Sequence, residues 1–422
     1  MPSSLEATPL SPQQWPFNLS WLPPQAHLVG GAVRDALLAR RQSPLDLDFI
    51  VCDGAIETAR AIARHYGAGF VVLDAGRQIA RVVFAGGTVD FACLEGATLA
   101  ADLARRDFTV NAIAYEPRAG AIVDPLQGQA DLERRCLRMV AAANLQADPL
   151  RLLRAYRLAA QLDFAIEAQT RATIRRWAPQ LARVAAERVQ TELRYLLRAP
   201  AGNAWLKAAG ADGVLSAWLP DADAAALECA ARVDGATRWL SERWPSLAPE
   251  LHAPLTNDPT ACWPLLAKFA SLAAPSADRA QAQLAALGLS RAEVRSAATA
   301  VRHWARVAAA PRSIRAQFEL FRAVGAAFPG VALLVAAAGS DRAAITQLLD
   351  RYAHPGDPVA HPHSPVSGRD LMRALGLSPS PQIGELLTEI QLARACGDIA
   401  TAEEALAWAA SWLGQRAPKT GD

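Results

Sequence analysis

The sequence predicts an α+β fold, with a mixed-sheet head followed by an all-helical remainder. Between His27 and about Val140, short runs rich in β-branched and aromatic residues alternate with segments of helical composition. After Asp148 the strand signals stop, and the chain becomes rich in Ala, Leu and Arg at helical spacing. Because 422 residues exceed what one ordinary core holds, we expect several packed units.

The expected elements of the head follow from these runs. Strand composition marks the segments 27–31, 45–51, 69–75, 80–94, 110–117, 120–125 and 136–140. Helical composition marks 33–41 and 55–67. A Pro-, Ser- and Trp-rich stretch at 1–26 predicts an irregular lead-in, and Pro-containing breaks at 244–264 and 354–368 predict linkers or long loops.

Composition excludes several classes of protein. With 52% hydrophobic and 20% charged residues the chain can bury a core, and a net charge of +2 predicts no partner by itself. Six scattered cysteines without a C-x-x-C pair argue against a zinc knuckle or a disulfide framework. Neither a signal peptide nor an uninterrupted apolar span is visible, so we expect a soluble cytoplasmic protein without a membrane or an evident stable protein partner.

Two carboxylates are expected on one face of a strand. In Leu45–Val51 acidic and apolar residues alternate, which places Asp46 and Asp48 on the same side of the strand. Neighbouring carboxylates repel each other unless a cation lies between them, and Mg²⁺ is the usual ion for oxygen ligands. Taken alone, this short pattern also fits a strand with a solvated acidic face.

A glycine turn precedes that strand. Leu28–Asp35 reads as a strand, a Gly30–Gly31 turn and the start of a helix, where the backbone N–H groups can bind phosphate. Arg34, one turn into the helix, could contact the same phosphates. The alternative is a tight turn that simply requires glycine.

A third pattern opens the helical part at Asp148. Asp148 suits an N-cap and Pro149 the first helical position, but neither explains the arginines at every third position, Arg151, Arg154 and Arg157. Successive members are offset by about 60° around a helix, so they form a spiral ridge. Guanidinium donors beside a carboxylate acceptor suit the edge of a base, whereas the alternative is a solvated basic face.

Charge is concentrated around this junction. Residues 101–200 contain sixteen arginines, no lysine and eleven acidic residues, a net charge of +5. The other segments are therefore slightly acidic in sum. A basic belt of this kind suits RNA or nucleotide phosphates.

Five motifs in order resemble the class II tRNA nucleotidyltransferases and the related bacterial poly(A) polymerases. The motifs are GGAVRDALL…LDLDF, RRDFTVNAIAY (105–115), DPLQGQADL (124–132), DPLRLLRAYRLAAQLDF (148–164) and ERVQTEL (187–193). The resemblance covers residues 27–197, and a weaker match at 368–387 resembles the C-terminal segment of the family. It implies a polymerase-β-like nucleotidyltransferase head (27–140), then a helical neck (141–200), body (201–355) and tRNA-binding tail (356–422).

The resemblance also implies roles for particular residues. Asp46 and Asp48 are expected to be catalytic and to bind Mg²⁺, with Gly31 and Arg34 at the triphosphate. Arg106 is expected to contact the nucleotide, with Asp107 and Asn111 at the ribose. Asp148 and Arg151 are expected to pair with the base, supported by Arg154 and Arg157, while Glu187 and Arg188 brace the neck.

Two departures from the family pattern bear on the activity. The base-reading motif of the family begins Glu-Asp, whereas Ala147 precedes Asp148 here. The segment between Asp90 and Arg105 is short, and relatives that complete CCA carry a longer loop there. We therefore expect CMP transfer from CTP to the tRNA 3′ end, with CC addition favoured over AMP transfer from ATP.

Several alternatives stay open at this stage. Full CCA addition, A addition and poly(A) polymerase activity use the same chemistry, and an inactive RNA-binding protein would keep the fold. Asp90 fits a third metal-facing carboxylate less well than a polar residue of the strand face. The scattered histidines, including His354, His361 and His363, do not support a fused metal-dependent phosphohydrolase.

Overall fold

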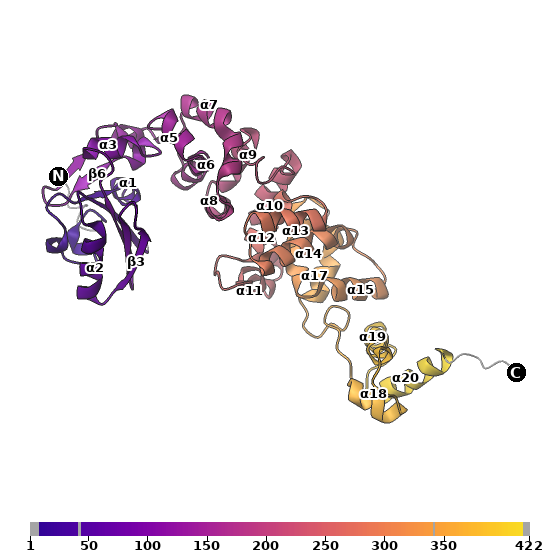
Figure 1. Cartoon of the computed structure of the whole chain (residues 1–422). Coiled ribbons are helices and arrows are strands. Elements are labelled where there is room, and N and C mark those ends of the chain that lie inside the picture. Colours follow the sequence, from indigo (N-terminus) through magenta and orange to yellow (C-terminus); the bar gives the residue numbers. More distant parts are fainter. Residues whose placement is uncertain (1–7, 41–43, 341, 417–422) are drawn as a thin grey trace. The chain divides into compact units, whose positions relative to one another are not determined.

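The computed structural model describes residues 8–40, 44–340 and 342–416 (Figure 1). It divides into two compact units, Met1–Ala217 and Trp218–Asp422. The first unit carries a mixed β-sheet and a set of helices, and in the described residues of the second unit helices are the only regular elements. The expected fold class is therefore confirmed.

Seven strands form one sheet in the order β3-β4-β5-β2-β1-β6-β7. Strands β2 and β5 pair in parallel and every other neighbouring pair is antiparallel, so the sheet is mixed. The bounds are β1 His27–Val29, β2 Leu45–Val51, β3 Gly69–Asp74, β4 Ile79–Phe84, β5 Gly87–Cys93, β6 Ala114–Glu116 and β7 Ala121–Val123. The expected strand at 110–117 is shorter, because residues 109–111 form a 3₁₀ turn.

Alternation along β2 separates a core face from a polar face. Leu47 and Phe49 are buried beside Val89 and Phe91 of β5, with which they are in register. The stacked rings of Phe49 and Phe91 lie 5.6 Å apart, centre to centre. The residues between them on β2 point to the opposite face, as the period of two requires.

The lead-in packs against this core face. Residues 1–7 of the segment expected to be irregular lie outside the described residues. The remainder contains two 3₁₀ turns, η1 (Pro12–Gln14) and η2 (Leu19–Trp21). Trp15 and Phe17 are buried, and the Trp15 ring meets that of Phe49 edge-on at 5.0 Å. The lead-in is therefore irregular in backbone but part of the core.

Ten further helical segments and a small second sheet complete the first unit. The helices are α1 Gly31–Leu37, α2 Ala55–Tyr66, α3 Leu99–Ala104, α4 Gly128–Glu133, α5 Ala142–Ala147, α6 Leu150–Leu162, α7 Ala168–Trp177, η4 Ala178–Arg183, α8 Ala186–Arg198 and α9 Gly202–Ala211. Strands β8 (Cys136–Leu137) and β9 (Ala165–Ile166) pair in parallel. Helix α6 begins two residues after Asp148, which follows the end of α5.

A buried carboxylate joins three of these helices. Asp212, at the end of α9, accepts hydrogen bonds of 2.5 Å from the Tyr156 hydroxyl on α6 and from Nε of Arg171 and Arg175 on α7. Its side chain is completely buried. Burial, the largest influence, would raise the pKa of Asp212, but these hydrogen bonds outweigh it and lower the pKa.

The second unit contains eleven α-helices among its described residues. They are α10 Ala224–Arg243, α11 Leu247–His252, α12 Trp263–Leu272, α13 Ala277–Ala286, α14 Arg291–Ala308, α15 Ile314–Val324, α16 Phe328–Ala337, α17 Arg342–Tyr352, α18 Gly368–Leu375, α19 Pro381–Cys396 and α20 Ala402–Arg416. Helix α11 lies inside the segment expected to be a linker at 244–264. Residues 354–367 carry turns and hydrogen bonds without a regular element.

The most apolar segment of this unit is Ile314–Ala337. By length and composition its 24 residues could cross a membrane, but 72% of the apolar window is buried inside the protein. The segment comprises α15, a 3₁₀ turn at Gly325–Ala327 and α16, whose residues are all buried. This burial is typical of a core helix.

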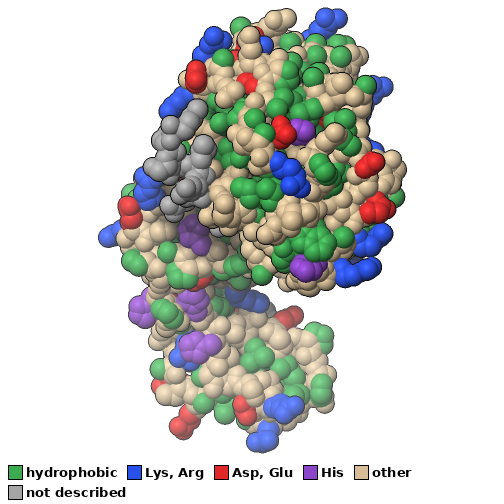
Figure 2. All heavy atoms as spheres, turned by 90° about the vertical axis from the view of Figure 1, so that its left-hand side faces the viewer, with side chains coloured by type: hydrophobic (Ala, Val, Ile, Leu, Met, Phe, Trp, Pro, Cys, Tyr) green, Lys and Arg blue, Asp and Glu red, His purple; other side chains and the backbone are tan. Residues whose placement is uncertain are grey.

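The C-terminal helices α18, α19 and α20 share a separate apolar cluster that includes Leu371, Leu386 and Ile390. On the face drawn in Figure 2, the described basic and acidic side chains are interspersed with hydrophobic ones. That mixture agrees with the small net charge of +2 for the whole chain.

Candidate active site

The polar face of the sheet brings three carboxylates together. In the parallel pairing of β2 with β5, Asp46 lies opposite Thr88 and Asp48 opposite Asp90. The Thr88 hydroxyl donates a 2.6 Å hydrogen bond to Oδ1 of Asp46. Asp46 and Asp48 thus share one face, as the alternation of β2 predicts.

Asp48 is a half-buried carboxyl in an electronegative position. Its pKa is raised from 3.8 to about 6: loss of solvent contributes most, the charges of Asp46 and Asp90 add to the rise, and the charges of Arg106 and Arg81 oppose it. Gly30, whose φ is +73°, approaches it closely: a Cβ at Gly30 would lie 3.4 Å from Asp48 Oδ2 and 3.4 Å from Arg106 Nη1. Both distances are near ordinary van der Waals contact, so it is the positive φ that favours glycine at this position.

Asp90 is neutralised within the sheet. Nε and Nη2 of Arg81, on β4, donate to its two carboxylate oxygens at 2.7 and 2.8 Å. This contact supports the preferred interpretation of Asp90 as a polar residue of the strand face. Arg81 could not be assigned from sequence because its partner is on another strand.

The carboxylates of Asp46 and Asp48 suit a divalent cation that keeps other oxygen ligands. Among the described residues no group of three or more His, Cys, Asp or Glu side chains is arranged to hold a metal ion. Mg²⁺ is commonly bound by one or two carboxylates together with water and substrate phosphates, so two carboxylates are sufficient. A cation bound here would offset the charges of Asp46 and Asp90, which together with loss of solvent raise the pKa of Asp48.

Arg34 is held rigidly beside the glycine turn. Its Nε and Nη2 donate to the two carboxylate oxygens of Asp35 at 2.9 and 3.0 Å, and its Nη1 donates to Asn111 Oδ1 at 2.6 Å. Nη2 would lie 3.5 Å from a Cβ at Gly31. Gly31 and Arg34, the residues expected at the triphosphate, therefore lie side by side, and their role there stays a prediction.

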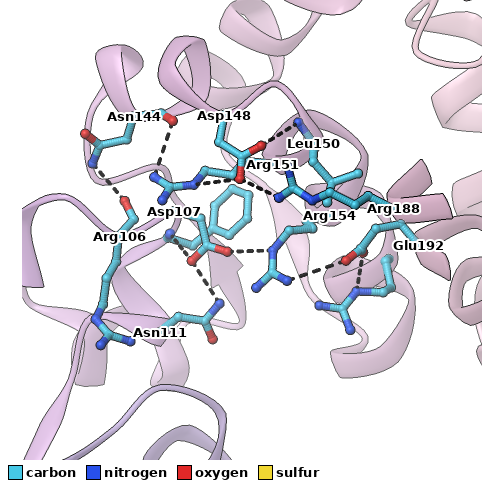
Figure 3. Close-up of polar contacts among 12 residues, drawn as sticks. Arg106, Asp107, Asn111, Asn144, Asp148, Leu150, Arg151, Arg154, Arg188 and Glu192 are labelled. Atoms are coloured by element: carbon cyan, nitrogen blue, oxygen red, sulfur yellow. Dashed lines mark hydrogen bonds and ion pairs between the residues drawn. The ribbon is translucent and has the colours of Figure 1, made fainter. Parts of the chain in front are cut away.

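A row of buried side chains connects the head with helices α6 and α8 (Figure 3). Asn111 Nδ2 donates to Asp107 Oδ1 at 3.1 Å, and Arg154 Nε donates to Asp107 Oδ2 at 3.0 Å. Beyond Arg154, Glu192 of α8 lies 3.5 Å from Arg154 Nη1 and 2.6 Å from Arg157 Nε. These contacts fix the helices against the head.

Asp107 stays ionised inside this row. Burial is the largest influence and would raise its pKa, but the charge of Arg154 and the hydrogen bonds from Asn111, Phe108 N and Arg154 lower it overall. The pKa of Glu192 is raised instead. Burial raises it more than the positive charges of Arg157 and Arg154 lower it.

Asp148 and Arg151 form a pair at the start of α6. Asp148 Oδ1 accepts from the Leu150 N–H at 3.3 Å, and Arg188 Nη2 of α8 donates to Asp148 Oδ2 at 2.9 Å. Arg151 Nε lies 4.0 Å from the same oxygen, while its Nη1 donates to the backbone carbonyl of Arg105 at 2.8 Å. A carboxylate acceptor and guanidinium donors are therefore held side by side (Figure 3).

These residues line one cleft of about 260 Å³. Its lining contains six arginines and two aspartates: Arg77, Arg105, Arg106, Asp107, Asp148, Arg151, Arg154 and Arg188. Of the expected nucleotide-binding residues, Arg106, Asp148, Arg151 and Arg154 line it. The lining does not include Gly31, Arg34 or Arg157: Arg34 lines a neighbouring cleft, and Arg157 faces Glu192.

Arg77 and Arg105 are members of this cleft to which sequence reasoning assigned no role. Glu95, in the short segment after β5, joins them: it lies 2.7 Å from Arg77 Nη2 and 2.6 Å from Arg105 Nη1. Arg77 follows β3 and lies far from Arg105 in sequence, so no local pattern could have found it. Arg105 belongs to the quoted RRD run, which was the available signal.

Comparison with known families covers most of the chain. The model of the poly A polymerase head domain matches residues 26–138. The "Probable RNA and SrmB- binding site of polymerase A" matches residues 163–226. A tRNA nucleotidyltransferase domain 2 model matches residues 256–410.

Individual relatives align with this chain over nearly its whole length. A CC-adding tRNA nucleotidyltransferase of Synechocystis sp. is 46% identical over 94% of this chain and 96% of its own. An A-adding tRNA nucleotidyltransferase of Deinococcus radiodurans is 34% identical over 92% of this chain and 96% of its own. The solved CCA-adding enzyme of Bacillus stearothermophilus in complex with CTP superposes with a TM-score of 0.68, at 25% identity over 93% and 94% of the two chains. With these motifs, this fold and relatives this similar over their full length, the chain belongs to the tRNA nucleotidyltransferase family.

Proposed function

We propose that this protein transfers CMP from CTP to the 3′ end of tRNA without a nucleic-acid template and releases pyrophosphate. The observation that carries the proposal is the pairing of Asp148 with Arg151 at the wall of an arginine-rich cleft. The acceptor and donors offered there match the edge of a base, and the other arginines offer donors to a triphosphate.

The charge pattern of the pair explains which bases would be accepted. Cytosine and adenine both present an amino donor next to a ring-nitrogen acceptor, which complements the Asp148 carboxylate and the Arg151 guanidinium. Uracil and guanine present a carbonyl where the carboxylate lies, and two acceptors facing each other leave both without a hydrogen bond. The pair therefore favours CTP and ATP over UTP and GTP.

Asp46 and Asp48 are the proposed catalytic residues and Mg²⁺ ligands. Bound Mg²⁺ supplies activation of the terminal RNA hydroxyl and neutralisation of charge on the triphosphate. In the transfer, the 3′ hydroxyl oxygen forms a bond to the α-phosphorus of CTP while the bond to pyrophosphate breaks. Gly31, Arg34 and Arg106 are proposed to hold the phosphates, and Arg154 and Arg157 to support the site.

Addition of CC, without the terminal A, is the favoured form of this activity. The segment between β5 and α3 contains only residues 94–98, and Glu95 fixes it to Arg77 and Arg105 of the cleft. A cleft held in this way has little freedom to reshape for the larger adenine. The 46% identical relative is a CC-adding enzyme, which supports the same activity.

The alternatives are A addition, full CCA addition, and poly(A) polymerase activity on other RNA. The 34% identical relative is an A-adding enzyme, so A addition requires an explicit test. We further propose that the segments 141–200, 201–355 and 356–422 act as neck, body and tail, with RNA contacts in the tail. The cytoplasm is the proposed compartment.

The deciding experiment uses three synthetic tRNAs in magnesium buffer, ending before the CCA, after C and after CC. Each receives CTP alone, ATP alone or both, and products are resolved to one nucleotide. We expect the first two to be extended to CC and the third to remain unchanged even with ATP. Extension of the third tRNA by A, or long A tracts on any RNA, would replace CC addition by the corresponding alternative.

Asp46→Ala and Asp48→Ala separate catalysis from binding. We expect either substitution to abolish incorporation while tRNA binding, measured by gel shift, stays close to that of the unsubstituted protein. An unsubstituted protein that binds tRNA but releases no pyrophosphate from any nucleotide would instead be an inactive RNA-binding protein.

A further inference from the structure

A second cleft, separate from the nucleotide cleft, opens between the end of α1 and the ends of α6 and α8. Its volume is about 480 Å³, and its lining includes Arg34, Arg40, Tyr195 and Arg198. Arg40 and Arg198 are exposed, and Arg40 Nη2 donates to the backbone carbonyl of Gln161 at 2.8 Å. The arginines come from different elements and converge on one opening.

Tyr195 places an aromatic ring at this opening. Although most large apolar and aromatic side chains of the chain are buried, Tyr195 is 48% exposed. The guanidinium of Arg157 lies over its ring, 5.6 Å from the centroid, and Arg157 is itself fixed by Glu192. The ring is therefore supported from within the protein rather than buried by it.

Guanidinium groups beside a supported aromatic ring are the chemistry that binds single-stranded nucleic acid. Arginines contact the phosphates, and the ring stacks on a base without requiring a particular sequence. Asp35 is also in the lining, but it is already paired with Arg34. The exposed Arg40 and Arg198 therefore leave the opening basic.

The position of this cleft relative to the nucleotide cleft carries the argument further. Arg34 lines the second cleft, and Asp107 and Arg154 line the first. Between them runs one continuous row of hydrogen bonds, from Arg34 through Asn111 and Asp107 to Arg154. The linings of the two clefts are thus joined by one row of side chains, which is compatible with an RNA end and a nucleotide bound on either side of it.

We infer that the cleft of Arg40, Tyr195 and Arg198 binds the unpaired 3′ end of the acceptor RNA, with a base stacked on Tyr195. The inference rests on the proposed transfer to an RNA 3′ end and adds the residues that hold that end. Tyr195 is on this view a binding residue for RNA, whereas Asp148 and Arg151 serve the nucleotide.

Steady-state kinetics on the full chain tests this, using CTP and a tRNA that ends before the CCA. Tyr195→Ala is expected to raise KM for the tRNA roughly 5- to 150-fold, the range for one lost base stack. KM for CTP and the melting temperature should stay unchanged, and Tyr195→Phe should restore tRNA binding because the ring remains.

Salt dependence tests the arginines separately. Arg40→Ala and Arg198→Ala should each weaken tRNA binding and lower the slope of log affinity against log salt by about 1. Arg64→Ala is the matched control, because Arg64 is an exposed arginine of the head on α2, away from the cleft. It should alter neither quantity.

The outcomes separate this inference from the proposed function. Unchanged tRNA KM in Tyr195→Ala and Arg198→Ala, with normal transfer by the unsubstituted protein, would overturn the inference and leave the function standing. A rise in KM for CTP alone would also overturn it, because the cleft would then belong to the nucleotide. Lack of any transfer by the unsubstituted protein would instead refute the function itself.

Discussion

Arg154 Nε lies 3.0 Å from Asp107 Oδ2, and this ion pair joins helix α6 to the head. Asp107 directly follows Arg105 and Arg106, two of the arginines of the nucleotide cleft, and Arg154 lies about one helical turn beyond Arg151. The pair therefore fixes the residues proposed to read the base relative to those proposed to hold the phosphates. A displacement of about 1 Å can lower the rate of such a reaction about 100-fold, so a rigid connection between the two groups of residues matters for the activity.

The raised pKa of Asp48 predicts a link between pH, magnesium and stability. Because the folded protein holds this proton more tightly than the unfolded chain, the contribution of Asp48 to stability is fully present below pH 3.8 and is lost as the pH rises through about 6. A shift from 3.8 to about 6 corresponds to about 3 kcal/mol. At pH 7.5, Asp48→Asn should therefore raise the melting temperature in EDTA.

Magnesium should act on the same charge. Thermal unfolding at pH 7.5 is expected to show a higher melting temperature with MgCl₂ than with EDTA for the unsubstituted protein, and a much smaller increase for Asp48→Asn. At pH 5 the increase should shrink, because protons compete with the ion. A magnesium effect of equal size in both proteins would mean that the ion binds elsewhere.

Asp148 should control the choice of base. Asp148→Asn replaces an acceptor by an amide that can also donate, so the carbonyl of uracil finds a hydrogen-bond donor. The preference for CTP over UTP, measured as a ratio of kcat/KM values, should fall roughly 5- to 150-fold, the range for one lost bidentate contact. Asp163→Asn is the control, since its side chain is 81% exposed and outside the cleft.

Arg188 is expected to act through Asp148. Its Nη2 donates to Asp148 Oδ2, which orients the carboxylate. Arg188→Ala should reduce the preference for CTP less than Asp148→Asn does, and adding it to Asp148→Asn should change the preference little further. Independent, additive effects of the two substitutions would show that Arg188 contacts the nucleotide by itself.

Local patterns predicted the parts of the site that lie within one element. The period of two along β2 was enough to place Asp46 and Asp48 together, and the drift of about 60° per step along α6 explains the three different neighbours of Arg151, Arg154 and Arg157. Which neighbour each arginine meets depends on α8, because Glu192 arrives from another helix. Helix periodicity alone therefore could not show that Arg157 lies outside the nucleotide cleft.

Contacts between segments that are far apart in the sequence could not be predicted from local patterns. Arg77, Glu95 and Arg105 meet because a hairpin turn, a strand end and a helix end converge, and no spacing in the sequence records that convergence. The separate helix α5 was also missed, since its six residues, AANLQA, are too few for a clear period.

Glu95 should influence nucleotide choice without contributing much to stability. Its two partners are 40% or more exposed, and ion pairs at such positions contribute only about 0–1 kcal/mol. Glu95→Gln releases Arg77 and Arg105 at the cleft, so with ATP the variant should add A to a tRNA ending in CC, which the unsubstituted protein leaves unchanged. Glu57→Gln, an exposed carboxylate on α2, is the control, and equal nucleotide selectivity in both variants would remove Glu95 from this role.

Asp212 should be a major determinant of stability in the first unit. Asp212→Asn removes the charge that Arg171 and Arg175 share; because both arginines are partly exposed and can be solvated, the expected loss is that of hydrogen bonds to a charged group, about 1.5–3 kcal/mol. Tyr156→Phe removes one hydrogen bond to the same carboxylate and should cost about 1 kcal/mol in the free energy of unfolding. Both values can be measured by urea denaturation.

The pH dependence provides an independent check on Asp212. Its folded pKa lies below 3.8, so its stabilisation is present above that pH and is lost as the pH falls through the lower folded value. The difference in stability between Asp212→Asn and the unsubstituted protein should accordingly be constant from pH 6 to 8 and narrow below about pH 4. A difference that persists undiminished at low pH would mean that the substitution acts through packing, because the charge of Asp212 would then contribute nothing to holding α6, α7 and α9 together.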